Sequence, residues 1–190
     1  MTFSVVTLNI NGGRLPLRKA QVSLLVEQKR FDVVLLLETR CSSSCMSEWT
    51  RIMKGRWFFF RSWACPPAGV AIYLNLSFCA QGVTFKEIIK GHLISINFFH
   101  NGYKHTILNV YSPSTCTERL EIFTQVEMSL THLDFDGLVC LSGDFNCTLY
   151  PTLDCNGEEP HSPSTVPLKK ALSKFSLMDV WRLQNPSARQ

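Results

Sequence analysis

The sequence predicts one mixed α/β domain, and three observations lead to that fold class. Short, mainly apolar runs are typical of strands covered on both faces, and they occur at residues 3–10, 32–37 and 137–142. Residues 57–110 have the pattern of successive antiparallel strands, and two further segments carry apolar side chains at helical spacing. A chain of 190 residues has the length of a single domain, for which about 150 residues is usual.

The first elements alternate strand and helix. Gly12-Gly13 ends the first strand, and Pro16 favours the first turn of a helix that runs to about Lys29. The apolar face of this helix is predicted from residues at helical spacing: Leu17, Ala20, Leu24 and Leu25. After the strand at 32–37, a loop rich in Ser and Cys is expected at 41–47.

The middle of the chain predicts an antiparallel sheet. The expected strands are residues 57–61, 69–75, 83–89, 92–100 and 103–110. In the fourth of these, Ile94, Ile96 and Phe98 alternate with polar residues, as in a half-buried strand. Asn101-Gly102 then matches a favoured two-residue hairpin turn.

The last third predicts two helices around one more strand. Helix 116–133 begins at a capping box of Thr115 and Glu118. Its predicted apolar face is Leu120, Phe123, Leu130 and Leu133. After the strand at 137–142 and a loop at 156–167, Pro167 is expected to open a shorter helix, with three residues facing inward: Leu168, Leu172 and Phe175.

Composition excludes two classes of protein. With 45% hydrophobic and 18% charged residues, the chain is too apolar and too weakly charged to be intrinsically disordered. No apolar window approaches the roughly 18 residues of a membrane span, so no membrane association is expected. The net charge of +4 is compatible with a polyanionic partner but does not demand one.

The eight cysteines do not predict a disulfide scaffold. Met1 leads into an apolar run with no signal peptide. Cys79 and Cys140 lie in apolar stretches, as buried thiols do, and no CxxC pair occurs. We therefore expect a reduced, intracellular setting and no secretion.

Four apolar strands end in clusters of polar residues, at 7–12, 36–40, 108–113 and 141–146. Ligands of α/β folds bind at the carboxyl ends of strands. Alternation along a strand puts Asn109 and Tyr111 on one face, and likewise Asp144 and Asn146. With Glu38 and Asn9, these tips offer carboxylates, carboxamides and a phenol, which suit Mg²⁺ or Mn²⁺ better than zinc. Such a metal with open positions is typical of a phosphoryl-transfer site.

In content, order and spacing these segments resemble the motifs of the endonuclease/exonuclease/phosphatase superfamily. The matching residues are Thr7-Leu8-Asn9-Ile10-Asn11-Gly12, Leu36-Leu37-Glu38-Thr39, Asn109-Val110-Tyr111-Ser112-Pro113 and Gly143-Asp144-Phe145-Asn146. The nearest resemblance is to the apurinic-endonuclease-like nuclease, related to exonuclease III, of LINE-type retrotransposons. It implies a DNase I-like fold, a two-sheet β-sandwich flanked by helices, in a single domain over residues 1–190.

The resemblance also implies Mg²⁺- or Mn²⁺-dependent hydrolysis of DNA phosphodiesters. Carried over by position, Glu38 would bind the metal with Asn9 beside it. Asp144 would orient or deprotonate the attacking water, and Asn146 would hold the phosphate or the nucleophile. Tyr111 would donate a hydrogen bond to the phosphate, with Asn109 supporting the site.

The sequence departs from the superfamily pattern at several points. Leu37 stands where Gln is usual, and Cys155 follows Asp154 where LINE relatives usually have Arg. The Ser-Arg-Ile-Asp-like strand and the final Ser-Asp-His motif, which close the site in the family, do not occur in the sequence. No histidine replaces them on sequence grounds, so we expect a domain without its final strands and a chain of little or no activity.

Two other functions stay open at this level. One is phosphatase or phosphodiesterase activity of the same superfamily, and the other is a non-catalytic binding module that keeps the metal site as a relic of the fold. No protein partner is evident, although the chain is compatible with one part of a longer retroelement polyprotein. If the chain acts on genomic DNA, a nuclear location is expected.

Overall fold

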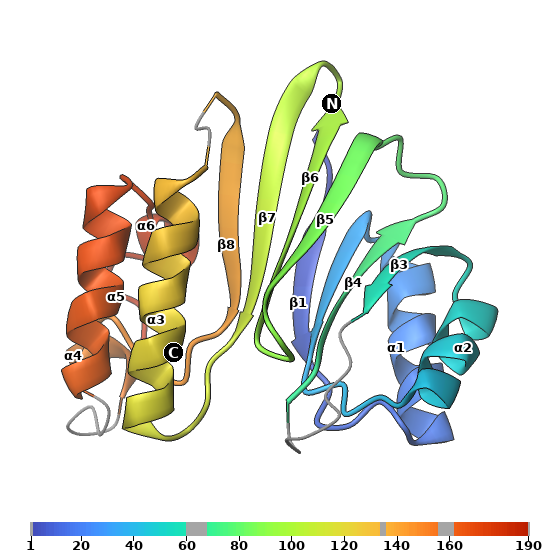
Figure 1. Cartoon of the computed structure of the whole chain (residues 1–190), viewed down its shortest axis with the longest axis horizontal. Coiled ribbons are helices and arrows are strands. Elements are labelled where there is room, and N and C mark those ends of the chain that lie inside the picture. Colours follow the sequence, from blue (N-terminus) through green and yellow to red (C-terminus); the bar gives the residue numbers. More distant parts are fainter. Residues whose placement is uncertain (1, 60–67, 134–135, 156–161, 190) are drawn as a thin grey trace. The chain divides into compact units, whose positions relative to one another are not determined.

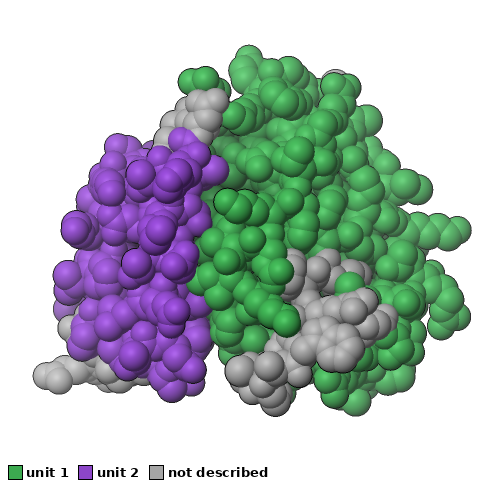
Figure 2. All heavy atoms as spheres, viewed as in Figure 1, with its two compact units in different colours: residues 1–111, 134–144 green, residues 112–133, 145–190 purple. Residues whose placement is uncertain are grey.

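A computed structural model of the chain describes residues 2–59, 68–133, 136–155 and 162–189. The chain divides into two compact units (Figure 2). The first contains residues 1–111 and 134–144, and the second contains residues 112–133 and 145–190. Among the described residues, none of the helices combines the length and apolar character that a membrane span requires.

The first unit is built on two four-stranded sheets (Figure 1). Sheet A has the order β1 (Val5–Asn9), β2 (Val33–Leu37), β4 (Val70–Asn75) and β3 (Gly55–Phe59). Sheet B has the order β5 (Gln81–Ile89), β6 (Leu93–His100), β7 (Tyr103–Tyr111) and β8 (Leu138–Asp144). Two helices, α1 (Pro16–Lys29) and α2 (Ser43–Ile52), belong to the same unit. The predicted two-sheet α/β fold class is therefore confirmed.

Strand β2 is buried along its whole length and separates two cores. Val33, Leu35 and Leu37 point towards sheet B and pack in one cluster with Ile96 and Ile107. The alternate residues Val34 and Leu36 pack in a second cluster with side chains of α1 and α2, such as Val26 and Trp49. Coverage on both faces is the reason that β2 has an uninterrupted apolar sequence.

The second unit is helical. It contains α3 (Cys116–Thr131), α4 (Pro151–Asp154), α5 (Ser162–Lys174) and α6 (Val180–Gln184). Helices α3 and α5 pack together, and Lys174 Nζ donates to Glu127 Oε1 over 2.8 Å. Arg119 is fully buried on α3, where its guanidinium donates to Ser164 Oγ and to the carbonyls of Pro113 and Ser114.

Two segments expected as loops are partly helical. Residues 43–52 form α2, because Ser42 accepts from Cys45 N at the helix start and Cys45, Trp49 and Met53 bury one face. Helix α5 begins at Ser162, so Pro167 lies inside it and does not open it. The rest of the loop predicted at 156–167 lies outside the described residues.

The predicted apolar faces of two helices are shifted. Leu17, Ala20 and Leu24 are exposed on α1, which instead buries Val22, Val26 and Lys19. Lys19 is accommodated because its ammonium group pairs with Glu48. On α3, Phe123 and Leu130 are buried as predicted, but the rest of the face is formed by Arg119, Ile122 and Val126.

Two smaller expectations are wrong in part. Cys79 is exposed, whereas Cys140 is half-buried, and its burial raises the pKa of the thiol. The Thr115 hydroxyl donates to Glu118, but the Thr115 side chain does not cap a backbone N–H of α3.

One carboxamide joins the two sheets in the centre of the first unit. Asn109 on β7 is fully buried, and its Nδ2 donates to the carbonyls of Leu36 on β2 (3.3 Å) and Ala71 on β4 (3.1 Å). Closer to the edge of the sheets, Thr7 Oγ1 on β1 and Ser142 Oγ on β8 share a hydrogen bond of 2.5 Å. These polar contacts fix how sheet A sits on sheet B, which apolar packing alone does not specify.

We predict that Asn109→Asp lowers the free energy of unfolding at pH 7 by more than about 2 kcal/mol, because it replaces a two-proton donor with a buried charge facing carbonyl oxygens. Urea denaturation measures the change. The same substitution at half-exposed Asn97 on β6 is the control and should cost less than about 1 kcal/mol. Equal stability of Asn109→Asp and the unsubstituted chain would show that the amide does not join the sheets.

Candidate functional site

Four strands of the first unit bring polar side chains to one edge. β1 runs parallel to β2, with Asn9 opposite Leu37, and β7 runs parallel to β8, with Tyr111 opposite Asp144. Parallel strands end at the same edge of a sheet. The tips of β1, β2 and β8 meet through hydrogen bonds of Asn9 to Glu38 and Asp144.

Asn9 is the centre of this cluster. Its Nδ2 donates to Glu38 Oε1 over 2.9 Å and to Asp144 Oδ2 over 3.1 Å. Its Oδ1 accepts from the backbone N–H of Asn11 at 3.1 Å, which fixes the orientation of the amide. One amide group therefore holds together two carboxylates, one following a strand of sheet A and the other ending a strand of sheet B.

Glu38 is presented by an unusual backbone conformation. Its φ of 51° and the φ of 47° at Arg40 lie in the left-handed region, which is strained for residues with side chains. The strained turn is held by Gly12 N–H, which donates to the Glu38 carbonyl over 2.8 Å, and by Gly13 N–H, which donates to Thr39 O over 2.7 Å. Strain held in place by surrounding hydrogen bonds is a feature of functional sites.

The charges of the cluster are balanced by neighbouring donors. Partial burial raises the pKa of Glu38, but hydrogen bonds from Asn9 and Arg40 outweigh it, so that the pKa lies below its ordinary value of 4.5. Arg40 Nη2 reaches Glu38 Oε2 at 2.6 Å. Glu38 is therefore ionised at neutral pH.

The pKa of Tyr111 is shifted upwards, in the opposite direction from that of Glu38. Burial, together with the negative charges of Glu38 and Asp144, raises the pKa of its phenol to about 12. The hydroxyl thus keeps its proton at neutral pH and donates it to Glu38, and the same proton can be donated to another anion in place of Glu38.

The donor set fits a hard divalent cation. The carboxylates of Glu38 and Asp144 both accept a hydrogen bond from Asn9 Nδ2 and therefore lie close together. Mg²⁺ is commonly held by one or two carboxylates, with water in its other positions. Within the described ranges, no group of three or more His, Cys, Asp or Glu side chains is arranged to hold a metal. The cluster itself offers oxygen donors, from two carboxylates and a carboxamide, and these suit Mg²⁺ or Mn²⁺ better than zinc.

Two of the predicted site residues donate hydrogen bonds to backbone carbonyls. The Asn109 amide is used between the sheets, where it bonds to two carbonyls. Asn146 belongs to the second unit, where its Nδ2 donates to Ser112 O over 2.7 Å. β8 ends at Asp144 and Asn146 has a φ of 47°, so the strand alternation used to group these two residues does not extend to Asn146.

Two neighbours of the cluster were not among the predicted site residues. Arg40 pairs with Glu38, and its carbonyl accepts from Arg14 Nε at 2.5 Å. His92 lies beside Tyr111: the ring centroids are 5.7 Å apart and the planes are inclined by 14°. The position of His92 beside Tyr111 follows from the register in which β6 pairs with β7, and a single sequence does not reveal that register.

Comparisons with known proteins bear on the fold of the chain and on its relatives. No family model matches the chain. The transposon TX1 uncharacterized 149 kDa protein of Xenopus laevis is 33% identical over 186 residues, which cover 98% of this chain but 14% of that protein. The chain thus spans about one seventh of its curated relative.

Two solved structures illustrate the fold similarity. The AP endonuclease LMAP of Leishmania major superposes with a TM-score of 0.81 and 14% identity, over 99% of this chain and 71% of that one. The APE2 catalytic domain of Xenopus laevis superposes with a TM-score of 0.76 and 19% identity, over 97% of this chain and 73% of that one. The solved structures confirm the DNase I-like fold that the resemblance implies, and at these identities they establish the fold alone.

We predict that Asn9→Ala raises the pKa of Glu38, because the Asn9 hydrogen bond stabilises the ionised carboxylate. The pKa would be followed by NMR titration of the Glu38 side-chain carboxyl carbon. The lowered pKa of Glu38 in the folded chain stabilises the fold above about pH 4.5, and this contribution is lost as pH falls through the pKa of the folded state. Asn9→Ala should therefore reduce this part of the free energy of unfolding.

Ser77→Ala, which alters an exposed hydroxyl bound to Asn75 in the same unit, is the control for this titration. An unchanged Glu38 pKa in Asn9→Ala would show that Asn9 does not set the charge of the cluster.

Proposed function

We propose that this chain catalyses divalent-metal-dependent hydrolysis of phosphodiester bonds in DNA. The observation that carries the proposal is the Asn9 amide, which holds the Glu38 and Asp144 carboxylates together. A protonated phenol, Tyr111, lies beside the same carboxylates. Negative oxygens for a metal and a neutral donor for a phosphate are the two groups that phosphoryl transfer requires.

Each residue is assigned one task. Glu38 and Asn9 would hold Mg²⁺ or Mn²⁺, which when bound supplies positive charge for the phosphate oxygens. Asp144 orients and deprotonates the attacking water as a general base. Tyr111 donates its hydroxyl proton in a hydrogen bond to a phosphate oxygen, and its raised pKa keeps that proton available at neutral pH.

Two residues have supporting tasks in this proposal. Asn109 acts through the sheets, because its amide fixes β7 against β2 and β4, and β7 ends at Tyr111. Asn146 follows Asp144 by two residues, and its amide would hold the phosphate or the nucleophile.

DNA is the proposed substrate for two reasons. Solved structures with the same fold carry the names AP endonuclease and APE2, and the relative with the higher identity is named as a transposon protein. Arg40 adds positive charge next to Glu38, and Arg14 bonds to the Arg40 carbonyl; these positive charges favour a polyanion. We propose further that the chain is one part of a longer transposon protein and acts in the nucleus.

We predict Mg²⁺-dependent nicking of plasmid DNA, abolished by EDTA and restored by excess Mg²⁺ or Mn²⁺. Single-turnover conditions, with enzyme in excess over DNA, make a low rate measurable.

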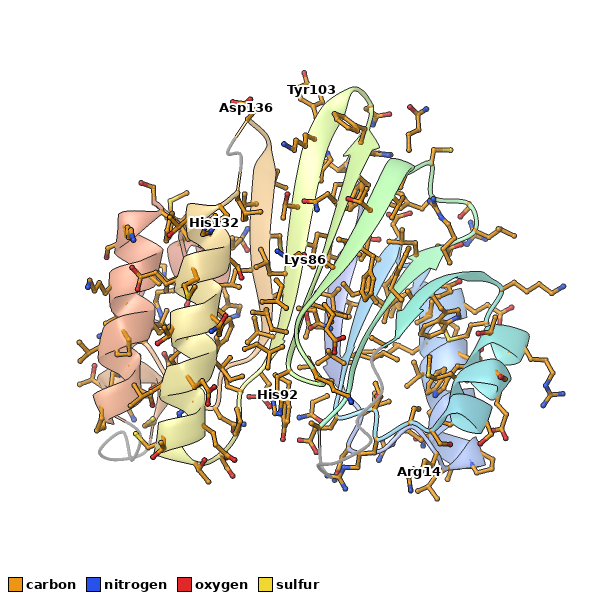
Figure 3. All side chains as sticks on the ribbon, viewed as in Figure 1. Arg14, Lys86, His92, Tyr103, His132 and Asp136 are labelled. Atoms are coloured by element: carbon orange, nitrogen blue, oxygen red, sulfur yellow. The ribbon has the colours of Figure 1, made fainter. Side chains whose placement is uncertain are left out.

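Substitutions then separate this site from contaminating nucleases. Asp144→Ala should lower the single-turnover rate by about 10²–10⁴-fold through loss of the general base. Tyr111→Phe should lower it by at least about tenfold through loss of one donor. Tyr103→Phe is the matched control, because Tyr103 is exposed at the opposite end of β7 (Figure 3).

The outcomes divide clearly. Nicking that persists in Asp144→Ala places the activity outside this cluster. No nicking by the unsubstituted chain, together with no heat of Mg²⁺ binding in calorimetry, favours a non-catalytic relic of the fold.

A further inference from the structure

We propose that His92 is a DNA-binding residue of this site, which contacts a phosphate next to the one that is cleaved. The proposal rests on the proposed function and adds a residue to it. His92 lies immediately before β6, at the end of the first unit opposite to Tyr103 and Asp136 (Figure 3).

The register of sheet B places His92 beside Tyr111. Leu93 on β6 pairs with Val110 on β7, so the next position towards the site pairs His92 with Tyr111. The Tyr111 N–H donates to the His92 carbonyl over 2.7 Å, which extends the pairing to this position. Since Tyr111 is in turn opposite Asp144 on β8, the three residues form one row across three neighbouring strands.

Two contacts with Tyr111 hold the His92 ring in a defined orientation. Its ring stacks on the ring of Tyr111, with centroids 5.7 Å apart and an interplanar angle of 14°. Its Nδ1 lies 2.9 Å from the Tyr111 carbonyl oxygen. A carbonyl only accepts hydrogen bonds, so Nδ1 carries a proton.

Nε2 of His92 is available for a ligand. No hydrogen bond to Nε2 of His92 is formed within the part of the chain that the structure describes, and the residue is half-buried. An imidazolium ring at this position has one N–H for the Tyr111 carbonyl and one for an anion. A phosphate oxygen of DNA would accept the second in a charge-assisted hydrogen bond.

This contact would place two neighbouring donors of sheet B on the DNA backbone. The Tyr111 hydroxyl would reach the phosphate that is cleaved, and His92 would reach an adjacent phosphate. Phosphate contacts give affinity and register without reading sequence. His92 should therefore act on DNA affinity and leave the chemical step largely unchanged.

Two substitutions separate a phosphate contact from a packing role. His92→Phe keeps an aromatic ring against Tyr111 but has no N–H, whereas His92→Arg loses the ring stack but keeps a cation with N–H donors. His132→Phe is the control, because Nδ1 of His132 also bonds to a backbone carbonyl, that of Met128, on α3 of the second unit.

The readouts are single-turnover cleavage near pH 6.5 and the anisotropy of a labelled DNA duplex in EDTA. His92→Phe should raise the half-saturating enzyme concentration and the Kd by about tenfold, as expected for a lost charge-assisted hydrogen bond. The maximal cleavage rate should stay within about twofold, because the contact is the same in the ground and transition states. His92→Arg should bind DNA within about threefold of the unsubstituted chain.

Each result decides a different point. Unchanged half-saturation and Kd in His92→Phe, or His92→Arg as weak as His92→Phe, would overturn the role of His92 and leave the nuclease proposal standing. Absence of cleavage with the expected Kd changes rejects the nuclease proposal but supports the DNA contact. Absence of both cleavage and DNA binding rejects both.

Discussion

The site depends on the way in which sheet A is fixed against sheet B. Asn9 and Glu38 come from the strands of sheet A, whereas Tyr111 and Asp144 end strands of sheet B. The faces between the sheets are apolar, and apolar contacts alone tolerate sliding by small amounts. The buried Asn109 amide, with donors to one carbonyl on β2 and one on β4, gives the interface a directional contact two residues before Tyr111.

Once the sheets are fixed, the site must bring like charges together. Two carboxylates near one point repel each other unless donors or a cation lie between them. The Asn9 amide and the Arg40 guanidinium provide part of that compensation, and the phenol of Tyr111 adds a donor without adding charge. The remaining negative character is what would attract a divalent metal.

Local sequence patterns predicted the position of most helices and strands, but they did not predict which faces of the helices are buried. The strands of both sheets were predicted because alternation and apolar runs follow from strand geometry. Helix α2 was missed because its contacts, such as the hydrogen bond from Trp49 Nε1 to the Gly13 carbonyl, join segments far apart in the sequence. Leu17 and Leu24 were assigned to a buried face of α1 because apolar spacing does not reveal the partner of a face.

By itself, the sequence determined which residue types stand at the strand tips. Parallel strands that end at one edge bring their tips together, so Asn9, Glu38, Tyr111 and Asp144 could be selected before any coordinates were known. The tertiary structure alone decided that the Asn109 amide joins the sheets and that His92 stands beside Tyr111. Both facts depend on which strands pair and in what register, and register is set by contacts between residues distant in the chain.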